Sequence, residues 1–312
     1  MIEVAIMIEG QNGLTWERWQ KIAAATEDLG FVGLYRSDHY TNASPPDKES
    51  LELWISLAWL ASHTKKIEFG PMVSPVSFRE PTMTARMARD VDDLSGGRLH
   101  LGLGAGWQER EHDNYGHDLL DIPERFTRFT EGIEVISQLL QSDEPVDFDG
   151  DYYDLTEAVL LPRPQRPGGP PILIGGNGPK RTLPLVAKYA QEWNSLFLTA
   201  EGFAELNSQL DQMLENEGRQ SSDVRRSMMN GLEYGRDDAD VRERVEKRTQ
   251  GKRTVEEWTA LGPIAGTGNQ IVDQLGKLAE AGVQRVMLQW LDLDDVDRLE
   301  AMAKEILPQL HG

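Results

Sequence analysis

The stretch Leu94-Ser-Gly-Gly-Arg-Leu-His-Leu-Gly-Leu-Gly-Ala-Gly-Trp-Gln-Glu-Arg110 is an apolar strand that runs directly into a glycine-rich loop tipped by tryptophan. Its glycines, Gly102, Gly104 and Gly106, leave no side chain where a large flat ligand could approach the backbone. The spacing lacks the third glycine of GxGxxG and no crossover helix begins at once, which disfavours a dinucleotide-binding fingerprint. We therefore expect a strand whose carboxyl end meets a ligand of another kind.

Eight segments of the chain repeat the order of an apolar strand followed by an amphipathic helix. Apolar residues spaced by three and four, as at Leu51, Trp54 and Leu57, are typical of a helix that packs against a sheet. Strict alternation predicts an α/β protein with a parallel sheet, and eight repeats favour a closed (β/α)8 TIM barrel over an open doubly wound sheet. The predicted strands are Ile2–Ile8, Phe31–Tyr35, Ile67–Val73, Leu99–Gly104, Pro171–Gly175, Trp193–Leu198, Met228–Tyr234 and Val283–Trp290.

The whole chain, residues 1–312, is expected to form one domain with loop insertions at about 107–122, 143–170 and 236–268. The second insertion contains a predicted hairpin, Val146–Leu155, in which Asp149-Gly150 is a signal for a two-residue turn. The third insertion is polar and charged.

Composition limits the possible partners. The net charge of -20 argues against nucleic acid and anionic membranes, because the mean field repels polyanions, although it is also what a surface tuned for solubility or high salt would show. The absence of cysteine excludes disulfides, thiolate catalysis and cysteine-ligated metals. No segment has the length of a membrane span, and the amino terminus opens as a strand rather than as a basic signal region, so we expect a cytoplasmic protein.

Unusual residues follow the predicted strands at the end where a TIM barrel carries its active site. After strand two, His39 could exchange a proton near neutral pH and Asp38 could orient a ring N–H or a ligand amide. The structural alternative is a loop hydrogen bond for Asp38 and an exposed histidine. After strand three, Gly70, Pro71 and Pro75 interrupt the strand and predict a bulge that could support a planar ring, unless the strand simply ends there.

After strand five, the run Gly175-Gly-Asn-Gly-Pro-Lys-Arg181 opens a helix. Free backbone N–H groups at a helix start favour an anion such as a phosphate, and Lys180 and Arg181 would add positive charge. A plain glycine-rich turn with surface basic residues is the alternative.

Other signals are weaker. His112 and His117 lack a partner that would complete a metal set, so we predict no metal site. No GxSxG, P-loop or HExxH motif occurs, which disfavours the common hydrolase and kinase mechanisms. Trp107, Trp193 and Trp290 lie near strand ends, where each could be core or could line a ligand site.

With these residues in view, the chain resembles the luciferase-like monooxygenase family, and within it the branch of coenzyme F420-dependent oxidoreductases. The resemblance covers nearly the whole length and rests on the order and spacing of four motifs. They are Ser37-Asp-His39, the run from Leu94 to Trp107, the Pro-Pro-Ile-Leu-Ile-Gly-Gly run from Pro170, and Glu192-Trp-Asn194.

The resemblance implies a barrel with an isoalloxazine-like ring at its carboxyl-terminal mouth, backed by a non-proline cis peptide in strand three. His39 matches a proposed proton donor, whereas Trp107 stands where the sugar-phosphate dehydrogenases of the branch have a catalytic glutamate. Tryptophan cannot perform that acid–base step, so their substrate is not carried over. Tyr40, Trp107 and Trp193 are expected at the substrate pocket. The expected cofactor-binding residues are Asp38, Pro71, Met72, Val73, Ser74, Ala105, Gly106, Arg110, Gly175, Gly176, Asn177, Gly178, Lys180 and Arg181.

The preferred hypothesis for the function is hydride transfer between F420 and a small organic substrate, with His39 or Tyr40 supplying the proton. A first alternative is an FMN-dependent monooxygenase that uses reduced flavin and oxygen, and a second is a flavin-binding barrel without activity. The resemblance also implies a homodimer that pairs through the early helices, here Leu51–Ala61 and Met83–Leu94.

Overall fold

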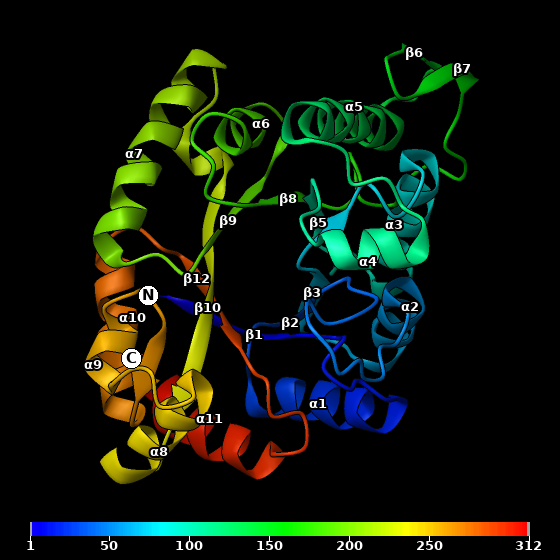
Figure 1. Cartoon of the computed structure of the whole chain (residues 1–312). Helices are drawn as coiled ribbons and strands as arrows, with labels where there is room; N and C mark the ends of the chain where they lie inside the picture. The colour runs from blue at the N-terminus through cyan, green and yellow to red at the C-terminus, as the bar shows by residue number, and fades with distance from the viewer. Residues whose placement is uncertain (1, 311–312) are drawn as a thin grey trace.

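The computed structural model describes residues 2–310 and has a closed parallel barrel at its centre (Figure 1). Hydrogen-bonded strands follow the order β3-β2-β1-β12-β10-β9-β8-β5-β4, and a parallel bridge between Phe69 of β3 and Leu99, just before β5, closes the row. The predicted TIM barrel is therefore confirmed. Its strands are β1 (Glu3–Ile8), β2 (Gly33–Arg36), β3 (Glu68–Pro71) with its continuation β4 (Ser74–Pro75), β5 (Leu101–Gly104), β8 (Ile172–Gly175), β9 (Glu192–Leu196), β10 (Arg225–Tyr234) and β12 (Arg285–Gln289).

Amphipathic helices surround the barrel (Figure 1). In α1, Trp19, Ile22 and Ala23 face the core, the side chain of Thr15 caps the first turn, and Gly30 ends the helix at φ 88°. The sequence spacing predicts a buried face of Trp16, Trp19, Ala23 and Thr26 and a stop at Gly30; all hold except Trp16, which is 38% exposed. The covering helices are α1 (Trp16–Leu29), α2 (Leu53–His63), α3 (Pro81–Ser95), α5 (Ile122–Gln141), α6 (Thr182–Tyr189), α7 (Ala200–Asn216), α10 (Gly268–Glu280) and α11 (Val296–Leu310).

The three predicted insertions each carry their own secondary structure. The first holds α4 (Glu109–Tyr115), and the second holds the hairpin of β6 (Val146–Asp149) and β7 (Asp154–Ala158), which projects beyond α5 in Figure 1. The third holds α8 (Asp238–Thr249), α9 (Val255–Thr259) and β11 (Ile264–Gly266), which adds to the end of β10. A short 3-10 turn, Ser221–Asp223, precedes β10.

The expected two-residue turn at Asp149-Gly150 is wrong. Asp149 pairs with Asp154, so four residues connect the strands. The carboxylate of Glu131 accepts hydrogen bonds from the backbone N–H groups of Asp151 and Tyr152 at 2.9 Å each, which holds the longer loop open. The local sequence could not predict this turn, because the contact that fixes it comes from Glu131 of α5.

The amino-terminal end of the barrel is closed by charged side chains. Arg285 donates to Glu3 at 2.8 Å and to the hydroxyl of Tyr35 at 2.8 Å, and it also pairs with Glu68. His100 lies between Glu68 and Glu192. A polar cavity of about 630 Å³ at this end is lined by most of the same charged groups, whereas the opposite, carboxyl-terminal end is the face at which TIM barrels build active sites. No helix within residues 2–310 combines the length and the apolar character needed to cross a bilayer.

Candidate active site

A cavity of about 550 Å³ opens at the carboxyl-terminal ends of the barrel strands. This is the face at which TIM barrels build active sites. Its walls come from all eight barrel positions and are mainly apolar. They comprise Met7, Glu9, Gln11, Ser37, His39, Met72, Val73, Pro75, Gly104, Ala105, Gly106, Trp107, Glu111, Phe126, Phe129, Gly175, Gly176, Thr182, Asn194, Leu196, Phe197, Met229 and Gln289.

The third barrel strand is interrupted between Pro71 and Ser74, as its proline residues led us to expect. β3 pairs with β2 up to Pro71, β4 pairs with β5 from Ser74, and the Met72–Val73 peptide between them is cis. Both Met72 and Val73 line the cavity, whereas Pro71 does not. The bulge is therefore present, and it supplies one wall of the site.

The glycines of β5 accommodate this bulge. A Cβ atom at Gly102 would lie 2.0 Å from the carbonyl oxygen of Pro71, and one at Gly104 would lie 2.5 Å from Val73 Cγ2. The alternating glycines were expected to make room for a ligand, but at Gly102 the neighbouring backbone takes that room. Gly106, at φ 87°, and Ala105 do line the cavity.

His39 is held at the cavity by a carboxylate that the sequence reasoning missed. Its Nδ1 lies 2.7 Å from Glu111 Oε1, and Glu111 Oε2 accepts from the backbone N–H of Tyr40 at 3.0 Å. Burial lowers the pKa of His39, but the hydrogen bond and the charge of Glu111 outweigh it, so the pKa lies above its ordinary value. With Nδ1 bound to Glu111, Nε2 is the nitrogen left to exchange a proton with a ligand.

A chain of polar side chains crosses the floor of the cavity. Ser37 Oγ donates to Gln11 at 2.7 Å, and Gln11 donates to Glu9 at 3.0 Å. The other oxygen of Glu9 accepts from Gln289 at 2.7 Å. These groups from β1, β2 and β12 are the polar part of an otherwise apolar cavity, and they can orient a ligand by hydrogen bonds.

Asp38 and Ser74 meet each other but do not line the cavity. Ser74 Oγ donates to Asp38 at 2.7 Å, and Arg79 pairs with Asp38 at 2.5 Å and with Glu52 at 2.8 Å. The hydrogen bond ties the loop after β2 to β4, and the ion pair ties the same loop to the segment after β4. A contact of Asp38 and Ser74 with a ring stays a prediction. The structural alternative for Asp38 is the arrangement observed.

The loop after β8 is partly occupied by its own hydrogen bonds. Asn177 donates to the carbonyl of Leu196 at 2.8 Å and accepts from its N–H at 2.9 Å, so its side chain joins two loops. Gly175 and Gly176 line the cavity, but Asn177 and Gly178 do not. Lys180 and Arg181 are exposed at the rim, with the guanidinium of Arg181 5.8 Å from the ring centre of Phe126.

The aromatic residues separate into different roles. Trp107 is 62% exposed, lines the cavity and meets the ring of His39 edge-on at 5.7 Å. The assignment of Trp193 to the substrate pocket is wrong: its ring is fully buried, stacks on Phe203 and donates to the carbonyl of Gly176. Trp193 is the second residue of β9, and its indole fills the layer between this strand and α7.

Two further predicted residues lie beside the cavity rather than in its walls. Tyr40 stacks on Tyr115 at 4.5 Å, and its hydroxyl lies 3.3 Å from His117. Arg110 is turned outward in α4, where it pairs with Asp47 at 2.7 Å. Arg110 therefore does not line the cavity, because adjacent positions of a helix point in different directions and α4 turns Glu111 inward and Arg110 outward.

The residues that were missed share a recognisable position. Glu9, Gln11 and Gln289 directly follow or end a barrel strand, where every polar residue is a candidate. Glu111 had no such signal, since it stands in a charged run that reads as a solvated surface. Only the packing of α4 shows that it is 1% exposed.

Comparison with known proteins identifies what the chain is similar to. The family model described as luciferase-like monooxygenase matches residues 2–258. An F420-dependent glucose-6-phosphate dehydrogenase of Amycolatopsis mediterranei is 30% identical over 298 residues, which are 91% of this chain and 83% of that protein. A 4-hydroxyprotoasukamycin monooxygenase of Streptomyces nodosus subsp. asukaensis is 33% identical over 162 residues, 52% of this chain and 42% of that protein.

Among solved structures, an F420-dependent secondary alcohol dehydrogenase in complex with an F420-acetone adduct superimposes with a TM-score of 0.85. It is 20% identical, and the match covers 98% of each chain. At that identity the likeness shows the barrel fold.

Proposed function

Because the chain belongs to the luciferase-like monooxygenase family, we propose that it is a coenzyme F420-dependent oxidoreductase that transfers a hydride between the deazaflavin and a small organic substrate. The observation that carries the proposal is the pairing of an apolar cavity with one oriented histidine. His39 faces the cavity at the carboxyl ends of the strands, and buried Glu111 fixes its ring. That arrangement suits a reaction in which a cofactor carries the electrons and the protein moves a proton.

The residues present fit a deazaflavin ring. Such a ring has two apolar faces and a polar edge. The cavity offers apolar side chains, among them Met72, Val73 and Leu196, and one buried acceptor, Asn194 Oδ1, that has no hydrogen-bond partner among the described residues. An orphaned acceptor on a cavity wall is costly unless a ligand donates to it.

We assign the ring to Met72, Val73, Ala105, Gly106 and Asn194, and the phosphate side to Gly175–Gly178 with Lys180 and Arg181 at the rim. The N–H of Gly176 already donates to the carbonyl of Asn194, so it is the first turn of α6, just beyond this loop, that favours an anion at that end. When bound, the deazaflavin gives or takes the hydride.

The chain itself controls the proton and the water. His39 Nε2 is the acid when the substrate is reduced and the base when an alcohol is oxidised. Glu111 stabilises the charged imidazole, since it holds Nδ1–H at 2.7 Å. Trp107, at the mouth, covers the ring of His39 and limits the access of solvent to it.

A parallel titration of the purified protein with F420 and with FMN, followed by fluorescence, tests the proposal. We expect saturable binding of F420, followed by reduction or oxidation of the bound cofactor with a member of an alcohol and enone panel. Tight binding of FMN with oxygen consumption would favour the monooxygenase alternative. Binding of F420 without turnover of any panel member would favour a barrel without activity, and equal unsaturated signals from both cofactors would refute the assignment.

We also propose that two copies of the chain pair through α2 and α3. Ile55 of α2 is 62% exposed and Met83 of α3 is 50% exposed, on helices that pack against each other. Large apolar side chains on adjoining helices support a protein interface. Size-exclusion chromatography with light scattering should give about twice the 35.1 kDa of the chain, and Ile55→Glu should halve that mass.

A cytoplasmic location is part of the same proposal. The chain contains no cysteine and so gains no stability from an oxidising compartment. Cell fractionation with an antibody against the protein tests it, and recovery in a secreted or envelope fraction would count against it.

A further inference from the structure

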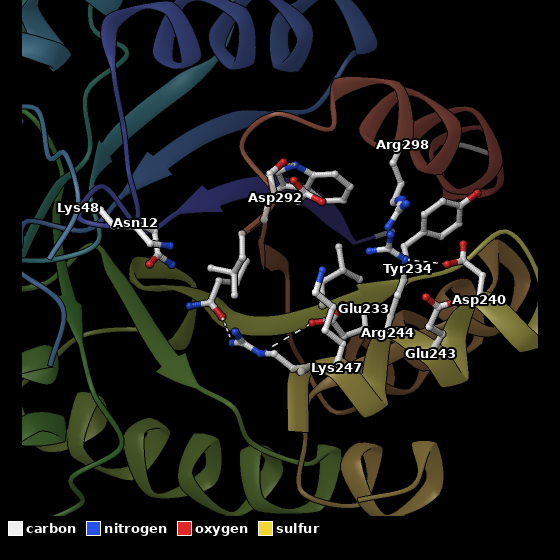
Figure 2. Close-up of a pocket in the computed structure, with 15 residues that line it drawn as sticks. Asn12, Lys48, Glu233, Tyr234, Asp240, Glu243, Arg244, Lys247, Asp292 and Arg298 are labelled. Carbon is white, nitrogen blue, oxygen red and sulfur yellow. Dashed lines mark hydrogen bonds and ion pairs between the residues drawn. The ribbon is translucent and has the colours of Figure 1, made fainter. Parts of the chain in front are cut away.

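A second cavity, of about 530 Å³, lies beside the first at the ends of β10 and β12 (Figure 2). It is bounded by α8 on one side and by the start of α11 on the other, with Asn12 and Lys48 at its far edge in Figure 2. The family motifs quoted above contribute no residue to it. Its charged lining consists of Lys48, Arg244, Lys247, Arg248 and Arg298 with Glu233, Asp240, Glu243 and Asp292.

Cations slightly outnumber acids in this lining, in a chain whose net charge is -20. Several of the acids are already engaged: Asp240 pairs with Arg244 at 2.9 Å, and Glu233 lies 3.8 Å from Arg248. Burial raises the pKa of Glu233 to about 7, so this carboxyl is partly protonated at neutral pH. By contrast, Lys247 has no ion pair with any residue of 2–310.

Arg298 is the clearest sign of a missing ligand. It extends from α11 toward the cavity in Figure 2, where Arg244 approaches from α8. Its Nε and Nη1 are buried and have no hydrogen-bond partner in the described part of the chain, while Nη2 pairs with Asp295 at 3.1 Å. A guanidinium with unpaired buried donors is stabilised by an anion that fills them.

The second cavity adjoins the first at one side chain. Gln289 lines both cavities: its Nε2 donates to Glu9 at 2.7 Å on one side, and its Oε1 accepts from Arg248 at 3.3 Å on the other. One amide side chain therefore forms part of the wall of each cavity.

We propose that the second cavity binds the acidic group of the substrate, a carboxylate or a phosphate, while the reacting carbon lies in the first cavity beside His39. This inference rests on the proposed function and deepens it, because it gives the substrate class as acids with an apolar body. Arg298, Arg248 and Lys247 are the residues that bind the anion.

The cofactor's own anionic tail is the other possible source of such a group, but the position disfavours it. The predicted phosphate side follows β8, whereas the second cavity lies at β10 and β12, and β9 separates β8 from β10 in the sheet. Gly176, just after β8, is therefore two strands away from β10 along the barrel wall. The substrate remains as the molecule that spans both cavities.

Inorganic phosphate titrated calorimetrically into F420-saturated protein tests the inference, because the cofactor's phosphate site is then filled. We expect saturable binding that Arg298→Gln weakens about tenfold or more, as for the loss of a charge-assisted hydrogen bond. Arg298→Lys should retain part of the phosphate affinity. Lys247→Gln, at a side chain without an ion pair, provides a variant whose folding is not at risk and should also weaken binding.

Arg242→Gln is the matched control, since Arg242 is exposed on the same helix and does not line this cavity. It should bind phosphate as the wild type does. Equal losses in Arg242→Gln and Lys247→Gln, or no binding beyond that of chloride at equal ionic strength, would overturn the inference. So would a loss of F420 affinity in Arg298→Gln, which would give the cavity to the cofactor's tail.

The F420 titration separates this inference from the proposed function. If F420 binds and phosphate does not, the function stands and the substrate class is wrong. If F420 does not bind, the proposed function fails, and phosphate titrated into the free protein still decides whether Arg298 forms an anion site.

Discussion

His39 Nδ1 lies 2.7 Å from Glu111 Oε1, although the two residues are 72 positions apart along the chain. One comes from the loop after β2 and the other from α4, the short helix after β5. Glu111 also accepts the backbone N–H of Tyr40, so a single buried carboxylate fixes both the loop and the imidazole. Glu111 thus positions the imidazole that we propose as the proton-exchanging group, and it need not touch the substrate to do so.

Glu111→Gln should lower kcat about tenfold or more while KM changes little, because Gln cannot stabilise a charged imidazole. The pKa of His39, raised by Glu111 in the wild type, should fall. The limb of the pH–rate profile that His39 sets, the acid limb for alcohol oxidation and the alkaline limb for reduction, should move to lower pH with it. The amide oxygen can still accept from Tyr40, so the loop should keep its conformation. The measurements are steady-state kinetics across pH and NMR titration of the histidine.

Glu109→Gln is the control for that experiment, since Glu109 is exposed on the same helix. An unchanged pH profile in Glu111→Gln, or an equal shift in the control, would show that Glu111 does not act through His39.

Gly104→Ala should destabilise the protein by about 1–3 kcal/mol and weaken F420 binding, because the new Cβ would lie 2.5 Å from Val73 Cγ2. The double variant with Val73→Ala should recover part of both losses, since it removes the clashing methyl groups. Gly276→Ala in α10, where nothing lies within 4 Å of the added atom, should be neutral or stabilising. Urea unfolding and fluorescence titration measure the effects, and a double variant no better than Gly104→Ala would contradict the explanation.

Thermal stability should fall as the pH rises through the titration of His100. Burial lowers the pKa of His100, but hydrogen bonds to Glu192 and Glu68 raise it above its ordinary 6.5. Because folding raises the pKa of His100, the protonated imidazole contributes to the free energy of unfolding. That contribution is complete below pH 6.5 and is lost as the pH rises through the higher folded-state pKa. The Tm of the wild type should therefore decline above pH 6.5.

Glu68, in the same cluster as His100, should make the protein less stable as the pH falls. Burial raises the pKa of Glu68, but His100 and Arg285 outweigh it and hold the pKa below the ordinary 4.5, so the stability it contributes is present above pH 4.5 and lost below. His100→Gln should cost up to about 3 kcal/mol near pH 6 and flatten the alkaline decline. His63→Gln, outside this cluster, should leave the curve of Tm against pH unchanged; a decline that persists in His100→Gln would count against the assignment.

The two tryptophans should respond in opposite ways. Trp193→Ala should cost about 3–5 kcal/mol of unfolding free energy, since it empties a fully buried site and removes a hydrogen bond to Gly176. Trp107→Ala should change stability by about 0.5 kcal/mol or less, because the ring is 62% exposed, but should raise the KM for substrate. Chemical unfolding and kinetics distinguish them, and a Trp193 variant of normal stability with an altered KM would restore the sequence-based expectation.

Much of the barrel could be predicted because its signals are local. The apolar spacing at Trp19, Ala23 and Thr26 of α1 and its stop at Gly30 lie within one stretch of chain, and the structure reproduces them. The bulge after Pro71 was also predictable, since proline removes a hydrogen-bond donor from the strand. The turn after Asp149 was not, because the deciding carboxylate, Glu131, belongs to a helix earlier in the chain.

The candidate site divides in the same way. The strand ends that supply His39, Gly106 and Gly176 could be located from alternation alone, since parallel strands direct their carboxyl ends to one face. The sequence could not show which side chains point into the cavity. Glu111 and Arg110 are neighbours in a charged run, yet one is buried against His39 and the other pairs outward with Asp47.

The amino-acid sequence by itself predicted a closed barrel and the face that carries its cavity, because periodicity and loop composition act over a few residues. Its motifs also resemble a family of flavin and deazaflavin enzymes. Tertiary structure alone decided that Glu111 supports the histidine, that Asp38 is taken by Arg79, and that a second, cationic cavity adjoins the first through Gln289. Those outcomes depend on burial and on distances between segments far apart in the chain. Electrostatic interactions are governed by such distances and by the exclusion of water, and neither quantity is contained in a local pattern of residues.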